Sequence, residues 1–416
     1  MSEPIRVLHF ADVHIGMENY GRTDPRTGLS SRVTDFLHAM DTMIDLARER
    51  DVDLVIFAGD AFKTRSPNPT YQREFAHRMR DLSELAPVVM LVGNHDLPPT
   101  QLKASSIEIY ETLRVPNILV ASAYDVYTIE TKRGMVAVGT APYPIRSRLL
   151  EDASTAGLTI AETDALLQDS LARILDELAT KADELDMPRV LTGHFTISGA
   201  VLGSERGIML GRDVAALLSS VADPRWDYVA MGHIHKHQNL TAALEAAPAV
   251  VYSGSIERID FGEEGDPKGF CWVELARGGT AWEFIPLAVR EFVTLEADLR
   301  TSANPTEQVL KLMKRYDLRE AVVRLNLELS PETDARLNES TLRDALKHAG
   351  AYQIASIRKQ IEQPARLRLG VSPEGLGPME LLERYFISKE MALDRRTELL
   401  DAAQALALRD EKDHGT

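Results

Sequence analysis

Five short clusters of Asp, Asn and His side chains each follow a run of apolar residues. The clusters are Asp12 with His14, Asp60, the run Asn94-His95-Asp96, His194, and His233 with His235. Two of the clusters have the spacing i, i+2, which places both side chains on the same side of an extended chain. Amide, imidazole and carboxylate groups are costly to bury without partners, so their recurrence after apolar runs predicts a functional site.

The chemistry of these side chains indicates a metal site. They offer oxygen and nitrogen donors and no thiolate, which suits Mn²⁺, Mg²⁺, Fe²⁺ or Zn²⁺. The donors outnumber what one ion needs, whereas two ions about 3.5–4 Å apart, bridged by one carboxylate, would use them. Such a pair lowers the pKa of a bound water to about 7 and stabilises the attacking and leaving oxygens of an in-line displacement. The pattern therefore predicts hydrolysis of a phosphate ester.

The segments before the clusters indicate an α/β fold. Buried strands are predicted at residues 5–11, 53–58, 88–92, 188–193 and 226–232, and helices at 33–50, 70–85, 101–113 and 160–185. A strand, a helix and a strand in succession form a βαβ unit, so the sheet begins as a parallel one. Ligands of open α/β sheets bind beyond the carboxyl ends of the strands, so the five clusters are predicted to meet.

Three further segments are predicted to be β structure. Residues 117–145 alternate apolar runs with turns, which is typical of an antiparallel meander. Two more strands are predicted at 250–252 and 270–273.

The composition is that of a soluble globular protein. The chain has 416 residues, 44% of them hydrophobic, which predicts two or three domains. The single cysteine, Cys271, excludes an internal disulfide and a multi-cysteine metal site. No apolar run approaches the roughly 20 residues of a membrane helix, and the N-terminus leaves no room for a signal peptide, so a cytoplasmic location is predicted. The net charge of −16 argues against a strongly basic surface but does not exclude DNA, because metal ions and a local basic strip can contact phosphates.

The C-terminal third is predicted to contain separate parts. Residues 286–363 alternate strands (292–298, 321–329, 352–361) with helices (305–316, 339–349) and carry no His/Asp cluster, so we interpret them as an accessory α/β domain. Residues 364–378 are rich in Gly and Pro and indicate a linker. Residues 379–416 are predicted to be a helical tail. Its first apolar stripe consists of Leu381, Leu382, Tyr385 and Phe386.

The order Asp-x-His, Gly-Asp, Gly-Asn-His-Asp, Gly-His, Gly-His-x-His resembles the calcineurin-like metallophosphoesterase superfamily. Within it, the chain is similar to the SbcD family of DNA-repair nucleases, and the segment 253–263 (SGSIERIDFGE), the accessory domain and the helical tail support this resemblance. The resemblance implies an α/β/β/α sandwich of two sheets over residues 1–285, a smaller α/β capping and DNA-binding domain at 286–363, and a partner-binding tail.

The resemblance also implies roles for the clustered residues. One ion would be held by Asp12, His14 and His235, the other by Asn94, His194 and His233, with Asp60 bridging them. His95 would stabilise the transition state and protonate the leaving oxygen, with Asp96 orienting its ring.

Two cations follow the bridging Asp60 in the sequence. Lys63 stands where relatives often carry His or Asp. It and Arg65 are candidate contacts to DNA phosphates, with solvated loop charges as the alternative.

The implied function is that of an Mn²⁺-dependent DNA nuclease, with two Mn²⁺ ions as cofactor and Mg²⁺, Fe²⁺ or Zn²⁺ as alternatives. It would act as a 3′–5′ exonuclease on double strands and an endonuclease on single strands, with DNA ends, single strands and hairpins as substrates. The expected partners are an SMC-like coiled-coil ATPase of the SbcC type, bound by the tail, and a second copy of the chain, bound through helices 70–85 and 101–113. We expect a nucleoid-associated cytoplasmic protein that repairs double-strand breaks.

Two other functions fit parts of the pattern. A phosphodiesterase or phosphatase acting on small or protein substrates could use the same metal site, but it would not need the accessory domain or the tail. A scaffold that binds DNA ends is disfavoured by the complete ligand set. The apolar positions of helices 70–85 and 101–113 suit core packing as well as dimerisation, and the tail has the alternative of folding back on its own domain.

Overall fold

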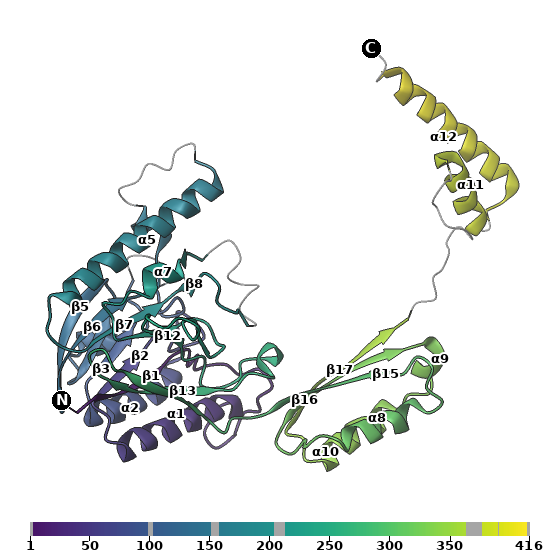
Figure 1. Cartoon of the computed structure of the whole chain (residues 1–416). Coiled ribbons are helices and arrows are strands. Elements are labelled where there is room, and N and C mark those ends of the chain that lie inside the picture. The colour runs from purple at the N-terminus through teal and green to yellow at the C-terminus, as the bar shows by residue number, and fades with distance from the viewer. Residues whose placement is uncertain are drawn as a thin grey trace. The chain divides into compact units, whose positions relative to one another are not determined.

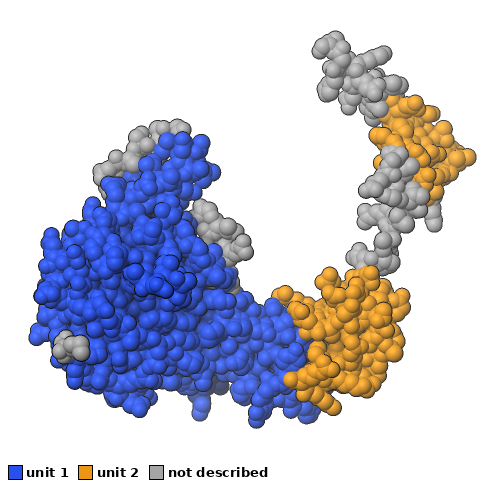
Figure 2. All heavy atoms as spheres, viewed as in Figure 1, with its two compact units in different colours: residues 1–295, 316–325, 343–356 blue, residues 296–315, 326–342, 357–416 orange. Residues whose placement is uncertain are grey.

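The computed structural model describes residues 3–98, 103–150, 158–203, 213–362, 377–389 and 391–413. The chain divides into two compact units (Figure 2). The first comprises residues 1–295, 316–325 and 343–356, and the second comprises 296–315, 326–342 and 357–416. Within the described residues, no helix is both long enough and apolar enough to cross a membrane.

Two six-stranded sheets form the centre of the first unit (Figure 1). The first has the order β14 (Ala281–Pro286), β13 (Gly269–Leu275), β1 (Ile5–Phe10), β2 (Leu54–Phe57), β3 (Val88–Leu91), β4 (Ile118–Ala121). The second has the order β11 (Gln238–Asn239), β12 (Ala249–Tyr252), β10 (Tyr228–Gly232), β7 (Arg189–His194), β6 (Gly134–Ala141), β5 (Asp125–Thr131). In each sheet four adjacent strands are parallel, namely β1 to β4 and β12-β10-β7-β6.

Helices cover the outer face of each sheet, and apolar side chains fill the space between the sheets. α1 (Ser31–Glu49) and α2 (Pro69–Leu85) pack on the first sheet, and α5 (Ile160–Asp183) packs on the second. A third cluster of buried residues joins the inner faces of both sheets. The predicted α/β/β/α sandwich is confirmed.

The ends of these helices follow from local chemistry. α2 begins with Pro69, and the side chain of Asn68 accepts a hydrogen bond from the backbone N–H of Thr70. α5 begins with a capping box between Thr159 and Glu162. The predicted limits of α1, α2 and α5 agree with the observed ones within two residues.

The prediction of one antiparallel meander at 117–145 is wrong. β4 pairs in parallel with β3 in the first sheet, whereas β5 and β6 form an antiparallel hairpin in the second. Residues 122–124 carry the chain from one sheet to the other, and a short apolar run does not specify which strand it will pair with.

The helix predicted at 101–113 is reduced to α3 (Ile109–Thr112) in the described part of that range. Ser106 donates its N–H to the carbonyl of Asp96 and its hydroxyl to the carboxylate of Asp96, which ties this segment to the end of β3.

The candidate dimer helices bury most of their apolar positions in the core of their own chain. Those core residues are Phe75, Met79, Leu82, Ile107 and Tyr110. Leu102 lies outside the described residues, and Ile109 and Leu113 are exposed. The homodimer stays a prediction.

The C-terminal elements agree with the predicted ones within about three residues. β15 (Phe292–Asp298), β16 (Val322–Leu329) and β17 (Gln353–Ile361) form a three-stranded sheet, and the helices are α8 (Pro305–Met313), α9 (Pro331–Asp334) and α10 (Glu339–His348). The proposed linker lies almost entirely outside the described residues. The tail contains two helices that contact each other, α11 (Pro378–Ser388) and α12 (Leu393–Asp413).

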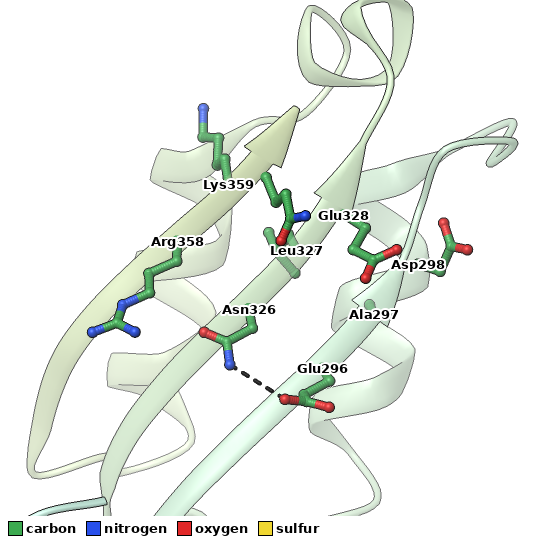
Figure 3. Close-up of a pocket in the computed structure, with 9 residues that line it drawn as sticks. Glu296, Ala297, Asp298, Asn326, Leu327, Glu328, Arg358 and Lys359 are labelled. Atoms are coloured by element: carbon green, nitrogen blue, oxygen red, sulfur yellow. Dashed lines mark hydrogen bonds between the residues drawn. The ribbon is translucent and has the colours of Figure 1, made fainter. Parts of the chain in front are cut away.

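One face of this sheet carries a polar hollow in the second unit (Figure 3). Carboxylates, two amides and two cations line it, namely Glu296, Asp298, Glu328, Asn326, Gln360, Arg358 and Lys359. Asn326 donates a hydrogen bond to Glu296. The mixture of charges means that the hollow is not a basic strip.

Candidate metal centre

The five clusters meet beyond the carboxyl ends of parallel strands from both sheets. Four of their residues have positive φ angles, namely 52° at Asp12, 46° at His14, 63° at Asp60 and 92° at His233. This backbone region is unfavourable for residues with a side chain, and it persists where the surrounding structure enforces it, often at functional sites. The chain therefore turns sharply after β1, β2 and β10 and directs these side chains toward one another.

Two glycines let the strand ends approach closely. A Cβ atom on Gly232 would lie 2.2 Å from the carbonyl oxygen of Ala58, which directly follows β2 of the other sheet. A Cβ atom on Gly93 would lie 2.2 Å from Oδ1 of Asp60. Both distances are far below a van der Waals contact, so any larger residue would separate the clusters.

A first donor group consists of Asp12, His14 and His235. The Nε2 atoms of His14 and His235 lie 3.0 Å apart, and one ligand atom from each of the three residues lies within 4.8 Å of the others. The Asp12 carboxylate also accepts the backbone N–H of His233, at 3.1 and 3.0 Å to its two oxygens. The three residues are at most 8% exposed, so their donor atoms are shielded from bulk solvent.

A second donor group consists of Asn94, His194 and His233. Oδ1 of Asn94 lies 3.0 Å from Nε2 of His194 and 3.0 Å from Nδ1 of His233. Three atoms with lone pairs thus converge on one point, as ligands of a metal ion do.

Asp60 lies between the two groups. Its Oδ2 atom is 3.6 Å from Nε2 of His14 and 3.5 Å from Nε2 of His194. Burial disfavours the charged form of Asp60, but the neighbouring imidazoles outweigh burial and hold the pKa of this carboxyl well below its usual value. Asp60 is therefore a carboxylate that faces one imidazole of each donor group.

Three histidines each have one ring nitrogen that points away from the centre, here called the outer nitrogen. A hydrogen bond from this nitrogen fixes the tautomer that metal binding requires. His194 donates from Nδ1 to the carbonyl of Ala58 at 2.6 Å, and His235 donates from Nδ1 to Glu263 at 2.8 Å. His233 donates from Nε2 to Asp213 at 2.7 Å. When each ring is neutral, its acceptor holds the proton on the outer nitrogen, so the inner nitrogen can offer its lone pair to the centre. The residues present fit a pair of divalent ions.

Burial also keeps His14 ready to act as a ligand. It lowers the pKa of His14 well below the usual value, so the imidazole is neutral at pH 7. For Asp12, burial raises the pKa of the carboxyl and so works against the carboxylate form, whereas His194 and His235 favour that form.

His95 and Asp96 stand beside the two groups, but Asp96 does not orient the ring of His95 as predicted. Nδ1 of His95 instead contacts the carbonyl oxygen of Lys63 at 2.7 Å. The Asp96 carboxylate accepts the backbone N–H groups of Asp60, Ala61 and Gly93 at 2.8, 3.0 and 3.0 Å. Asp96 thus ties the end of β2 to the end of β3 and supports Asp60, whose Oδ1 accepts the N–H of His95 at 2.8 Å.

Sequence reasoning missed Asp213 and Glu263. Glu263 belongs to the segment 253–263, but nothing in its spacing points to a histidine 28 residues earlier. Asp213 follows no predicted strand. Neither position carried a signal that could have identified it.

The remaining candidates lie outside the two donor groups. Lys63 is partly exposed and Arg65 is exposed, and no ion pair involves either one among the described residues. In the tail, Tyr385 is 43% exposed, Leu381 and Leu382 are partly exposed, and Phe386 is only 9% exposed. Phe386 therefore suits packing within the tail better than contact with a partner.

Comparison with known proteins gives consistent matches. The family model for calcineurin-like phosphoesterases matches residues 5–237. The SbcD component of the nuclease SbcCD from Escherichia coli is 27% identical over 405 residues, covering 95% of this chain and 94% of that protein. The same component from Bacillus subtilis is 28% identical over 300 residues, covering 68% and 70%. The DNA double-strand break repair protein Mre11 of Archaeoglobus fulgidus is 24% identical over 385 residues, covering 86% and 76%.

The family match covers more than half of the chain and includes all five clusters, and the clusters form the two donor groups described above. The chain therefore belongs to the calcineurin-like phosphoesterase family and is a metal-dependent phosphodiester hydrolase.

Proposed function

We propose that the protein is an Mn²⁺-dependent DNA nuclease of double-strand-break repair, with 3′–5′ exonuclease activity on double strands and endonuclease activity on single strands. The observation that carries this proposal is the pair of donor groups that share Asp60, with His95 beside them. The similarity to the SbcCD nuclease and to Mre11 supports DNA as the substrate.

Asp12, His14 and His235 would hold one ion, Asn94, His194 and His233 the other, and Asp60 would bridge them. Two bound ions would supply an activated water and would offset negative charge on the attacking and leaving oxygens. The protein itself holds the donors in place, since six of these seven residues are buried at strand ends.

His95 would protonate the leaving oxygen. A carbonyl oxygen only accepts hydrogen bonds, so the contact with Lys63 fixes a proton on Nδ1 of His95 and leaves Nε2 for the substrate. In the imidazolium form, Nε2 carries a proton that it can donate as the bond to the leaving oxygen breaks. A ring nitrogen of His95 lies within 4.8 Å of donor atoms of His14 and Asp60, which places the ring next to the reacting group.

Lys63 and Arg65 would contact DNA phosphates near the metal centre. The two cations follow Asp60 in one loop and form no ion pair among the described residues, so their charges are available to a polyanion. The substrates would be DNA ends, single strands and hairpins.

The tail would bind an SMC-like coiled-coil ATPase, and two copies of the chain would form a homodimer in a nucleoid-associated complex. Exposed Tyr385 next to partly exposed Leu381 and Leu382 gives α11 an apolar surface of the kind that partner helices cover. Deletion of residues 379–416 is expected to remove partner binding and leave Mn²⁺-dependent cutting of single strands.

The test is cleavage of DNA oligonucleotides that carry a label at the 5′ or the 3′ end, with Mn²⁺, Mg²⁺ or EDTA. The proposal expects Mn²⁺-dependent products, with a ladder from the 5′-labelled duplex that shortens progressively from its 3′ end. Asp60→Ala purified in parallel must be inactive, which excludes a contaminating nuclease. Turnover of a small aryl phosphodiester without any cutting of DNA would contradict the proposal and favour a small substrate.

A further inference from the structure

The two donor groups differ in the charge of their own side chains. The first contains a carboxylate, Asp12, together with His14 and His235. The second contains only the neutral donors Asn94, His194 and His233. Because both groups share Asp60, the second group alone has no charged ligand of its own for a divalent ion.

The carboxylate behind the first group is neutralised. Glu263 accepts a hydrogen bond from Nδ1 of His235 at 2.8 Å, and its other oxygen lies 2.8 Å from Nζ of Lys268. The side chains of Glu263 and Lys268 are both 0% exposed. The positive charge of Lys268 offsets the negative charge of Glu263, so this ion pair adds little net charge to the first group. Asp12 already supplies a carboxylate there.

The carboxylate behind the second group has different partners. Oδ2 of Asp213 lies 2.7 Å from Nε2 of His233 and accepts the hydroxyl of Thr196 at 2.6 Å, while Oδ1 accepts the hydroxyl of Tyr143 at 2.7 Å. Among the described residues, no Lys or Arg side chain forms an ion pair with Asp213. Its side chain is 12% exposed, so water screens its charge only weakly.

The surroundings hold Asp213 and His233 in one arrangement. The ring of Tyr143 lies 5.7 Å from the ring of His233, centroid to centroid, so the residue that hydrogen-bonds Asp213 also packs on the histidine. A carboxylate that accepts the outer N–H of a metal-binding histidine fixes its ring and makes the inner nitrogen a stronger donor.

We propose that Asp213 is a positioning residue that supplies, through His233, the negative charge that the Asn94–His194–His233 group lacks, and so allows this group to hold its metal ion. The inference rests on the proposed two-ion centre. It predicts that loss of the Asp213 charge weakens one ion and spares the other.

The test is a titration of the full chain with Mn²⁺ as the only added ligand. Binding is measured by calorimetry and by electron paramagnetic resonance. The wild type is expected to bind two ions and to give the spectrum of a magnetically coupled pair. Asp213→Asn keeps the shape of the side chain and removes its charge. It is expected to bind one ion as tightly as the wild type and the second about 10–100-fold more weakly, with the signal of an isolated Mn²⁺ ion.

Asp223→Asn is the matched control. It removes the same charge from the loop before β10, whereas His233 follows the other end of that strand. Asp223 forms an ion pair with Arg225 in this loop. It is expected to bind two ions with unchanged affinity. Tyr143→Phe keeps the Asp213 charge but removes one of its hydrogen bonds, so it should weaken the same ion by a smaller factor, and it carries the test if Asp213→Asn does not fold.

If Asp213→Asn bound two ions with unchanged affinity, the inference would be overturned and the proposed function would stand. If Asp213→Asn did not fold, the same result with a folded Tyr143→Phe would have the same consequence. Equal weakening of both ions would also overturn it. A wild-type protein that binds no Mn²⁺ would instead overturn the proposed function itself.

Discussion

Gly93 offers a direct test of how closely the strand ends must meet. In Gly93→Ala, the added methyl group would lie 2.2 Å from Oδ1 of Asp60 and 2.6 Å from its backbone nitrogen. Rotation of the Asp60 side chain relieves only the first of these contacts, because the second involves the backbone. The end of β2 or β3 must therefore move, and the shared carboxylate moves with it.

The size of the effect follows from these distances. Contacts this short must lengthen by roughly 1 Å, and a displacement of that size at a reacting group costs about 100-fold in rate. The extra methyl group should also destabilise the fold by about 1–3 kcal/mol, as overpacking of a filled core does. The assay combines the initial rate of oligonucleotide cleavage, Mn²⁺ affinity by calorimetry, and thermal unfolding.

Gly279→Ala is the control, because no atom lies within 4 Å of the Cβ position there and its φ angle is not positive. It should match the wild type in all three measurements. If Gly93→Ala cleaved DNA and bound Mn²⁺ as the wild type does, the claim that the two strand ends must meet closely around Asp60 would be refuted.

Three further perturbations have distinct expected outcomes. His95→Ala should abolish cleavage and leave Mn²⁺ binding unchanged, as measured by calorimetry, and loss of metal would show that His95 is a ligand. Lys63→Ala and Arg65→Ala should each weaken oligonucleotide binding and lower the slope of log affinity against log salt by about one, whereas an unchanged slope would exclude a phosphate contact. Burial raises the pKa of the Cys271 thiol to about 12, so the thiolate is nearly absent at pH 8 and a disulfide reagent should modify this residue only when the chain unfolds. Rapid modification of the folded protein would contradict that burial.

The strand-end residues could be predicted because their pattern is local. An apolar run followed by Asp or His marks a strand and its end, and parallel strands bring such ends to one edge of a sheet. This reasoning placed Asp12, Asp60 and His194 together without knowledge of the order of the strands. It also predicted α1, α2 and α5, whose apolar positions repeat with the period of a helix.

The features that were missed depend on contacts between distant segments. The four residues of β4 do not specify which strand it pairs with. The ring of His95 contacts the backbone carbonyl of Lys63, and such a contact has no sequence signature. Asp213 and Glu263 are carboxylates in segments without a period, so only the folded structure brings them to His233 and His235.

The central claim is that five strand ends form one centre for two metal ions that share Asp60. Anomalous diffraction from crystals grown with Mn²⁺, collected near the manganese absorption edge, tests it most directly. The structure predicts two anomalous peaks, one on each side of Asp60. One peak should lie among Asp12, His14 and His235, and the other among Asn94, His194 and His233. A single peak, or peaks away from Asp60, would contradict the claim.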